Sequence, residues 1–577
     1  MDNLNYGIIG NCKSAALISD SGSIDWCCLP EFDSSSVFAK ILDEEKGGSF
    51  EILVSDDYKI KQYYLFKTNI LCTSFSNGND AFELLDFMPR YKEENGSHYQ
   101  PPDIIRYIKL VSGKPVFSVK YLPRLEYAQH PVKITFHKKY IKTYTTKGDY
   151  DSLYLYTDID HQKIVKSEKI EILKDSFFLI SYNQKLLPQN IERANLKMER
   201  TKVYWLNWSE RTTHYLEYQD EVMRSALVLK LLSFEKSGAV LAAVTTSLPE
   251  TIGEVRNWDY RFCWLRDASM VVKVMTDLGH LTIARRYIRF IIDIMPDKDE
   301  EIQIMYGINR EKKLKEEILE HLSGYKDSFP VRIGNAAYKQ KQHDIYGILM
   351  DVIYQHFMVF HTSLDYGESL WTITRSVVKL VKRNWKKPDR GIWEIRTEQK
   401  HFTFSKVLCW TAIDRAIKIA ELIKMDSYIK EWTKLANTIK ADIMEKAWNE
   451  KAGAFTQYYG SDDLDASNLL METYGFIDAK DPKYISTVLA TQKDLGRDGL
   501  MYRYKNKDDF GLPSSSFTIC TFWLINSLGK IGRKKEARQL FDQLLSYSNH
   551  LGLFSEDIDF ETKRLLGNFP QAYSHLA

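Results

Sequence analysis

The spacing of apolar residues changes once along this chain of 577 residues. Before about residue 185 the apolar segments are short and end at turn-forming residues, as in AALIS before DSGS and SFEILVS before DDYK. Beyond about residue 216 apolar residues recur every three or four positions over long stretches. The first spacing is typical of half-buried strands and the second of helices with one buried face. We therefore expect an α+β multidomain protein, with strands first and helices second.

The strand-forming half contains further candidates in IDWCCLP, IKQYYLF, NILCTSFSN, AFELLDFMP, IIRYIKLVSG, KPVFSVKYLP and SLYLYTDI. Their regular spacing favours a large antiparallel β-sandwich. A charged, helix-forming stretch follows, LPQNIERANLKMERTKVYWLNWSER. We place an N-terminal β-sandwich domain at residues 1–185, a helical linker at 186–215 and an all-α domain at 216–577.

The second half is predicted to contain long amphipathic helices. The expected helices are Tyr218–Phe234, Ala268–Leu278, Ile283–Ile294, His343–Phe360, Tyr366–Val381, Phe402–Ile423, Asp426–Ala447, Thr518–Leu528 and Lys534–Ser546. Several loops between them are long and rich in Trp, Gly and acidic residues, unlike the short connections of a plain helix bundle. Such loops on a helical scaffold are where a functional site is expected.

Charge and terminal sequence argue against two classes of partner. Lys and Arg number 79 against 77 Asp and Glu, so no large field of one sign favours nucleic acid or an anionic membrane. The N-terminus has no basic segment followed by an apolar run, and no stretch of about 18 apolar residues is present. Seven scattered cysteines show no disulfide framework. We expect a cytoplasmic protein with reduced thiols, and the oligomeric state stays open.

Signature motifs of metal, nucleotide and serine-hydrolase chemistry are missing. The sequence has no H-E-x-x-H, clustered Cys/His set, G-x-G-x-x-G, G-x-x-x-x-G-K-[ST] or G-x-S-x-G. No metal or organic cofactor is therefore expected. What remains are acidic residues set among aromatic residues and glycines in loops, and glycoside hydrolysis uses a pair of carboxyl groups.

The first such segment is NWDYRFCWLRDA, in which Trp264, Arg266 and Asp267 precede a predicted helix. An aspartate at a helix start is often a cap, because its carboxylate accepts orphan amide hydrogens. That alternative explains Asp267 but not the aromatic and basic residues around it. A planar guanidinium beside a fixed carboxylate can bind sugar hydroxyls, while an indole covers an apolar ring face.

The second segment is GIWEIR, in which Glu394 follows Trp393. An apolar neighbour disfavours the ionised carboxyl and raises its pKa, which is the setting of a general acid. The simpler alternative is a surface glutamate paired with Arg396.

The third segment is GLFSEDID, which contains Glu556. This carboxylate would activate water if Asp557 and Asp559 keep its surroundings polar and its charge in place. The alternative is an ordinary acidic loop, since the full EF-hand pattern is missing. None of the three segments decides the function by itself.

Together the segments carry a resemblance to a known family. In chain order, NWDYRFCWLRDAS, GIWEIRTEQKHFTFSKVLCW and GLFSEDIDFETKRLLGNFPQAYSHLA resemble glycoside hydrolase family 15, which includes glucoamylases, glucodextranases and a microbial group of α,α-trehalases. The opening YGIIGNCKSAALISDSGSIDWCCLPEFDSSSVFAKIL is similar to the prokaryotic branch, as are IQIMYGINRE and GYKDSFPVRIGNAAYKQKQHDIYG. The resemblance spans nearly the whole chain.

The resemblance implies an N-terminal antiparallel β-sandwich followed by an all-α (α/α)6 barrel, with the site at one end of the barrel. It implies that Glu394 is the general acid and Glu556 the general base. The innermost subsite, which holds the non-reducing glucose, would be formed by Trp264, Arg266, Asp267 and Trp393. Arg332, Gln342 and His343 are expected near the site without an assigned role.

The implied activity is that of an inverting, exo-acting α-glucosidase of the glucoamylase type. Such an enzyme releases β-glucose from the non-reducing end of α-linked gluco-oligosaccharides, so the expected partner is a small-molecule α-glucoside. Inversion needs carboxyl groups about 6.5–9.5 Å apart, because a water must fit between sugar and base. The main alternative is an α,α-trehalase of the same family. More remote alternatives are a disaccharide phosphorylase, disfavoured by Glu556, and an inactive sugar-binding protein, disfavoured by the presence of both glutamates.

One segment departs from the family. GLPSSSFTICTFWL has serines where many members carry Gly and Glu. We expect this loop to alter the outer subsites.

Overall fold

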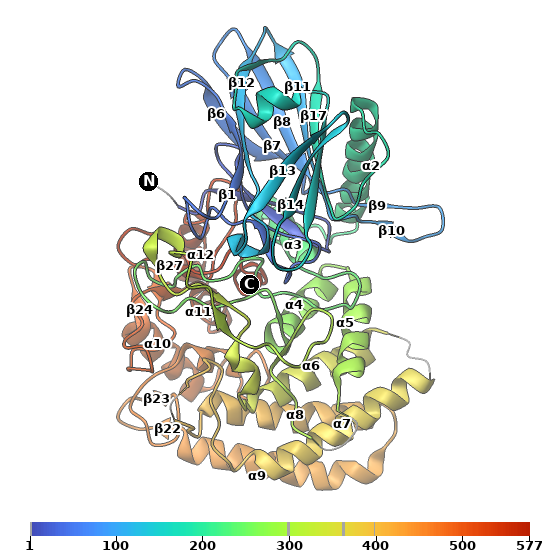
Figure 1. Ribbon diagram of the computed structural model, residues 1–577. Coiled ribbons are helices and arrows are strands. Elements are labelled where there is room, and N and C mark those ends of the chain that lie inside the picture. The colour runs from blue at the N-terminus through green and yellow to red at the C-terminus, as the bar shows by residue number, and fades with distance from the viewer. Residues whose placement is uncertain (1–2, 297–299, 361–363, 397) are drawn as a thin grey trace.

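The computed structural model describes residues 3–296, 300–360, 364–396 and 398–577. Antiparallel sheets lie at one end of the molecule and a helical region at the other, and the C-terminus returns to the junction between them (Figure 1). Among these described residues, none of the helices is long and apolar enough to cross a membrane. The seven cysteines are all buried and free.

Two antiparallel sheets form the N-terminal region. The first has the order β1 (Tyr6–Gly10), β2 (Ala15–Ser19), β3 (Ile24–Cys28), β5 (Ser49–Leu53), β12 (Val116–Leu122) and β16 (Ile170–Glu171), with β4 (Ser36–Phe38) beside β3. The second has the order β13 (Val132–His137), β14 (Tyr140–Thr145), β15 (Ser152–Thr157), β17 (Ser176–Tyr182), β11 (Asp103–Ser112), β8 (Ala81–Phe87), β7 (Leu71–Ser76) and β6 (Lys59–Tyr64). One buried core takes side chains from both sheets, so the predicted β-sandwich is confirmed.

Six strands of the two sheets, β1, β4, β13, β14, β16 and β17, are not among those predicted. β13 and β14 mix their apolar residues with Lys, Thr and His, which weakens their apolar signal. β17 is an almost continuous buried run, and such a run cannot be assigned to strand or helix by periodicity alone.

A buried arginine connects the two sheets. Arg106 on β11 donates to both carboxylate oxygens of Asp86 on β8, at 2.8 and 3.1 Å, and both side chains have 0% exposure. The same guanidinium donates to the carbonyl of Phe50 on β5 in the opposite sheet, at 2.7 Å. This contact crosses the apolar core and fixes one sheet against the other.

Helix α2 (Ile191–Ser209) covers the outer face of the second sheet. Its Met198 and Trp205 pack in one buried cluster with Tyr107 and Leu179 of that sheet. The domain limits at residues 185 and 215 stay a prediction, and a single buried core continues from the sandwich into the helical region.

The helical region is an (α/α)6 barrel. Its inner ring consists of α4 (Leu265–Asp277), α6 (Asp344–Val359), α8 (Thr403–Leu422), the 3₁₀ helix η5 (Ala466–Met471), α11 (Thr518–Lys530) and α13 (Ala572–His575). Each contacts the next, and α13 contacts α4, so the ring closes. The outer layer consists of α3 (Gln219–Leu231), α5 (Leu281–Ile294), α7 (Leu364–Asn384), α9 (Ile429–Lys446), α10 (Pro482–Leu495) and α12 (Lys534–Leu545).

The nine predicted helices are present, with ends shifted by a few residues. α4 begins at Leu265 rather than Ala268, which places Arg266 and Asp267 inside its first turn. α10 was not predicted, although Asp481 caps it and Pro482 occupies its first turn, a common start signal.

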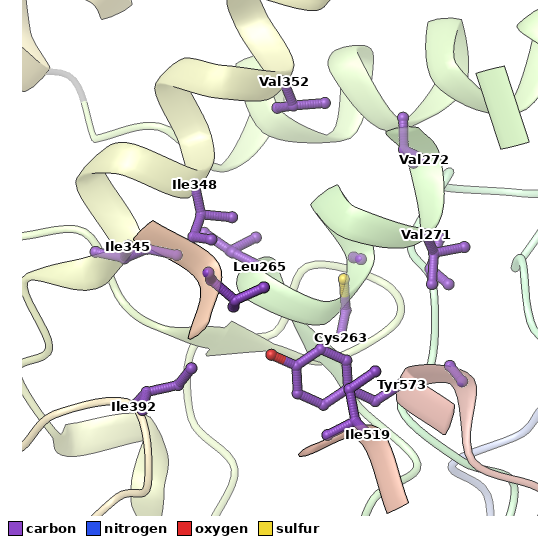
Figure 2. Close-up of a cluster of buried hydrophobic side chains, with 14 of the residues drawn as sticks. Cys263, Leu265, Val271, Val272, Ile345, Ile348, Val352, Ile392, Ile519 and Tyr573 are labelled. Atoms are coloured by element: carbon purple, nitrogen blue, oxygen red, sulfur yellow. The ribbon is translucent and has the colours of Figure 1, made fainter. Parts of the chain in front are cut away.

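The barrel interior is apolar and reaches the loop before α8. Figure 2 shows Leu265, Ile345, Ile519 and Tyr573, from four different inner elements, gathered with Ile392. Ile392 is 4% exposed and stands two residues before Glu394. The apolar core therefore holds one end of the loop that carries Glu394.

We predict that Arg106→Met destabilises the protein by about 3–5 kcal/mol, because it leaves Asp86 buried without a partner. The measurement is urea-induced unfolding followed by circular dichroism. Lys109→Met is the matched control on the same strand, since the pair of Lys109 with Glu83 is largely exposed and is worth about 0–1 kcal/mol. Equal losses in the two variants would contradict the role given to Arg106.

Candidate active site

A pocket is formed by several loop segments, each of which leads into an inner helix of the barrel. It is lined by residues before α4, α6, α8 and α11 and by Tyr573 of α13. Because these segments lead into helices of one ring, they gather at the same end of the barrel. A larger cavity of about 1360 Å³ lies between α2, the β9–β10 hairpin (Tyr91–Lys92 and His98–Tyr99) and α5, but it contains none of the six predicted site residues. We therefore place the candidate site at the barrel end.

The six predicted residues come together around this pocket. Arg266, Trp393 and Glu394 line it directly. Trp264 and Asp267 bind two of these side chains, and Glu556 lies behind the lining residue Tyr260. Three segments far apart in the sequence thus meet at one place.

The side chain and loop of Glu394 are held from several directions. The indole N–H of Trp264 donates to Glu394 Oε1 at 2.7 Å, and Arg266 donates to the carbonyl of Ile392 at 2.8 Å. The Glu394 backbone has a φ of 60°, which is unusual for a residue with a side chain and is often retained at functional sites. The Arg396 guanidinium lies 3.4 Å from the Glu316 carboxylate. Arg396 therefore pairs with Glu316, and the alternative surface pair with Glu394 does not form.

Burial raises the pKa of the Glu394 carboxyl, and the charge of Arg266 and the hydrogen bond from Trp264 partly oppose this. A carboxyl with a raised pKa keeps its proton to higher pH, as a general acid requires.

Arg266 and Asp267 form a buried pair in the first turn of α4. The Arg266 Nε donates to Asp267 Oδ1 at 2.7 Å, and Asp267 is 4% exposed. The Asp267 carboxylate is therefore engaged by a guanidinium at the pocket wall, which goes beyond the alternative of a simple helix cap.

The Trp393 ring is fixed at the pocket wall. Its indole N–H donates to both oxygens of Asp465, at 3.0 and 2.9 Å, and its ring centroid lies 5.4 Å from that of Phe517. The indole is thus held rigidly beside Glu394.

Glu556 is 1% exposed and is connected to the pocket through Tyr260. The Tyr260 hydroxyl donates to Glu556 Oε1 at 2.5 Å, and Oε2 has no hydrogen-bonding partner within the part of the chain that the structure describes. The Tyr260 ring also contacts Trp264 edge to face, at 5.2 Å between centroids. Tyr260 and Trp264 therefore link the two glutamates.

The surroundings of Glu556 differ from the expectation. Burial raises its pKa to about 8, and the nearby charge of Glu250 adds to the increase. Asp557 is buried beside it, and its pKa is raised for the same reasons, while Asp559 instead accepts a hydrogen bond from the Thr562 hydroxyl at 2.7 Å. The expectation that two aspartates keep Glu556 charged is wrong, because a group of buried like charges favours the protonated form.

One cation offsets this acidic group. Arg503 donates to Glu250 at 2.9 Å, and both side chains are buried. Glu250, Tyr260 and Arg503 were not identified from sequence. Tyr260 lies within the segment NWDYRFCWLRDA, so the sequence could have identified it. Glu250 and Arg503 lie outside the three segments, and only the fold brings them to the site.

None of the three residues expected near the site lines the pocket, but Arg332 and Gln342 are connected to it. Arg332 donates to the carbonyls of Val255 and Asn257, both at 2.9 Å, and its guanidinium lies 4.6 Å from the centroid of the Trp258 ring, which lines the pocket. Gln342 donates to Gln340 at 3.2 Å, and Gln340 in turn donates to the Glu394 carbonyl at 3.0 Å. The His343 amide donates to Asp389 at 2.8 Å.

No group of three or more His, Cys, Asp or Glu side chains among the described residues is placed to hold a metal ion. The pocket lining carries four carboxyl groups, four guanidinium groups and several aromatic rings, and Glu556 is bound to one of the lining residues, Tyr260. This set suits hydrolysis of a sugar–oxygen bond.

Comparisons with known proteins agree with this set. The sequence profile of glycosyl hydrolases family 15 matches residues 217–577, and that of trehalase-like N-terminal domains matches residues 5–162. A trehalase from Thermoplasma volcanium is 36% identical over 99% of this chain and 91% of its own length. A trehalase from Mycobacterium tuberculosis is 35% identical over 99% of this chain and 88% of its own length. The protein is a glycosidase. The chain belongs to glycosyl hydrolases family 15.

A solved structure shares the architecture. A bacterial glucoamylase complexed with acarbose matches 100% of this chain and 92% of its own, with a TM-score of 0.73 and 13% identity. This likeness concerns the fold alone. It confirms the predicted β-sandwich followed by an (α/α)6 barrel.

We predict that Gly567→Ala impairs hydrolysis of a glucoside by displacing Glu556. A Cβ at Gly567 would lie 2.8 Å from Glu556 Cβ and 2.9 Å from its Oε2. A shift on the order of 1 Å in a reacting group can cost about 10²-fold in rate. Gly552→Ala is the control, because Gly552 has a similar φ of 72° but its nearest neighbour would lie at 3.8 Å. Equal kcat/KM in both variants would argue against a tightly positioned Glu556.

Proposed function

We propose that this chain is an α,α-trehalase, which hydrolyses the bond between the two glucose units of trehalose with inversion. The observation that carries the proposal is the similarity to proteins named trehalase in Thermoplasma, Mycobacterium, Mycolicibacterium and Sulfolobus, at 33–36% identity and over 97–99% of this chain. The match of residues 5–162 to trehalase-like N-terminal domains supports the same activity.

The glucoamylase-type activity expected first has weaker support. Its structural counterpart, the bacterial glucoamylase, is 13% identical to this chain, and at that level a likeness carries no information on the substrate. Trehalose and α-linked oligosaccharides share the terminal α-glucosyl unit, so the residues expected in the innermost subsite serve either substrate.

In the proposed mechanism Glu394 is the general acid. Trp264 occupies one of its carboxyl oxygens, so the other is left to donate a proton to the glycosidic oxygen. The raised pKa described above keeps that proton on the carboxyl. Arg266, Asp267, Trp264 and Trp393 would hold the glucose whose C1 is attacked.

Glu556 is the general base. Tyr260 holds its Oε1, which directs Oε2 toward a water on the opposite side of the sugar. Deprotonated Glu556 takes a proton from that water as the water attacks C1. The water needs room, so we expect the two carboxyl groups to be about 6.5–9.5 Å apart in the complex.

The test is proton NMR of the glucose anomers formed from trehalose, maltose, isomaltose and a maltooligosaccharide. From trehalose, inversion yields one β-glucose from the attacked unit and one α-glucose from the leaving unit, so both anomers appear equally at early times. Glu394→Gln and Glu556→Gln should each lower kcat by at least about 10²-fold. Release of α-glucose alone, or a strict need for inorganic phosphate, would contradict the proposal.

The pH profile tests the environment of the base. Glu556 must be deprotonated to act, so its raised pKa means that kcat/KM increases as pH rises through that value. Glu250→Gln removes a neighbouring negative charge and frees Arg503, and both changes lower the pKa of Glu556. We therefore expect the acidic limb of the kcat/KM profile to move to lower pH. An unmoved limb would show that Glu250 does not act on the titrating base.

A further inference from the structure

A tight turn after β25 (Leu500–Met501) forms one wall of the pocket. Asp508 and Gly511 bond to each other through their backbones, at 3.0 and 3.3 Å, and Gly511 has a φ of 102°. The turn presents Asp508, Asp509 and Phe510 to the pocket that Glu394 also lines. The pocket is small, with a volume of about 80 Å³.

The turn is held by hydrogen bonds to two neighbouring side chains. Arg256 donates to both oxygens of Asp508, each at 2.7 Å, and Tyr504 donates to the same carboxylate at 2.6 Å. A bidentate guanidinium–carboxylate pair that is mostly buried is a directional contact. Asp508 is therefore used to hold the turn in place.

Asp509 reaches the loop of the proposed general acid. One of its oxygens accepts the backbone N–H of Arg396, and on the other side of Glu394 the carbonyl of Ile392 accepts from Arg266. Along the chain, Glu394 lies midway between these two anchor points. The family resemblance assigns Arg266 to the innermost subsite, so we take the part of the pocket beside Asp509 as the place of the sugar that Glu394 would protonate as it leaves.

The chemistry of this flank suits a sugar. Asp509 Oδ1 is buried and has no hydrogen-bonding partner among the residues that the structure describes. The Phe510 and Trp258 rings meet edge to face at 5.3 Å between centroids, and both line the pocket. A carboxylate oxygen accepts from sugar hydroxyls, and aromatic rings pack against the apolar C–H faces of sugars.

We propose that the turn Asp508–Gly511 forms the binding site of the leaving glucose, with Asp509 accepting a hydrogen bond from one of its hydroxyls. The inference rests on the proposed function for the identity of the leaving group. It assigns the turn to the second sugar of the substrate.

The experiment compares two substrates in Asp509→Asn. Trehalose carries a leaving glucose, and α-glucosyl fluoride carries only fluoride, which needs no second sugar site. The amide keeps the contact with the Arg396 N–H through its oxygen and turns an NH₂ group toward the pocket. We expect kcat/KM for trehalose to fall about tenfold to a hundredfold and that for the fluoride to change by less than about threefold.

Controls separate binding from damage to the acid. Lys507→Gln changes an exposed charge beside the turn and should leave both substrates unaffected. The basic limb of the trehalose pH profile reports Glu394 and should not move in Asp509→Asn. Equal losses on both substrates, a displaced basic limb or an unchanged trehalose rate would each overturn the assignment.

The result also distinguishes this inference from the proposed function. Wild-type protein that hydrolyses the fluoride but not trehalose would reject the trehalase activity. The comparison of Asp509→Asn with wild type is then made on whichever of maltose or isomaltose the wild type hydrolyses, and the same selective loss is expected there.

Discussion

The position of the proposed base depends on one buried ion pair. Arg261 donates to Asp259 at 2.9 and 2.7 Å, and the two residues flank Tyr260, whose hydroxyl binds Glu556. Arg261 also donates to the carbonyl of Ser34 in the N-terminal region, at 2.8 Å. Removing one partner of such a pair costs about 3–5 kcal/mol, because the other charge stays buried. The β-sandwich therefore takes part in building the site, rather than standing beside a self-sufficient barrel.

The two glutamates differ because their neighbours differ. Glu394 sits in a half-buried loop with a cation and an indole nearby, whereas Glu556 is enclosed with two further carboxyl groups and one guanidinium. Tyr260 and Trp264 connect the two environments through a hydrogen bond and a ring contact. The two carboxyl groups are therefore joined by a short chain of side-chain contacts, although their electrostatic surroundings differ.

Local patterns located much of the fold and the site. The nine predicted helices and the change from strands to helices follow from apolar periodicity, which neighbouring residues determine. The strand β17 was missed because a continuous apolar run has no distinguishing period. Helix α10 was missed although Asp481 and Pro482 mark its start. In the site, Trp264, Arg266, Asp267, Trp393, Glu394 and Glu556 stood out because acidic and aromatic residues cluster in their loops, and the fold brings all six together.

The sequence by itself determined the order of the two architectures and the three loops that supply the carboxyl groups, since these depend on residues close together in the chain. Only the tertiary structure decided which distant residues share the pocket. Glu250 and Arg503 carry no local signal, yet their charges act on Glu556 through a short, desolvated distance. Asp509 likewise becomes a pocket residue only because its turn is bound to Arg256. Electrostatic interaction depends on separation in space and on burial, and neither can be read from position along the chain.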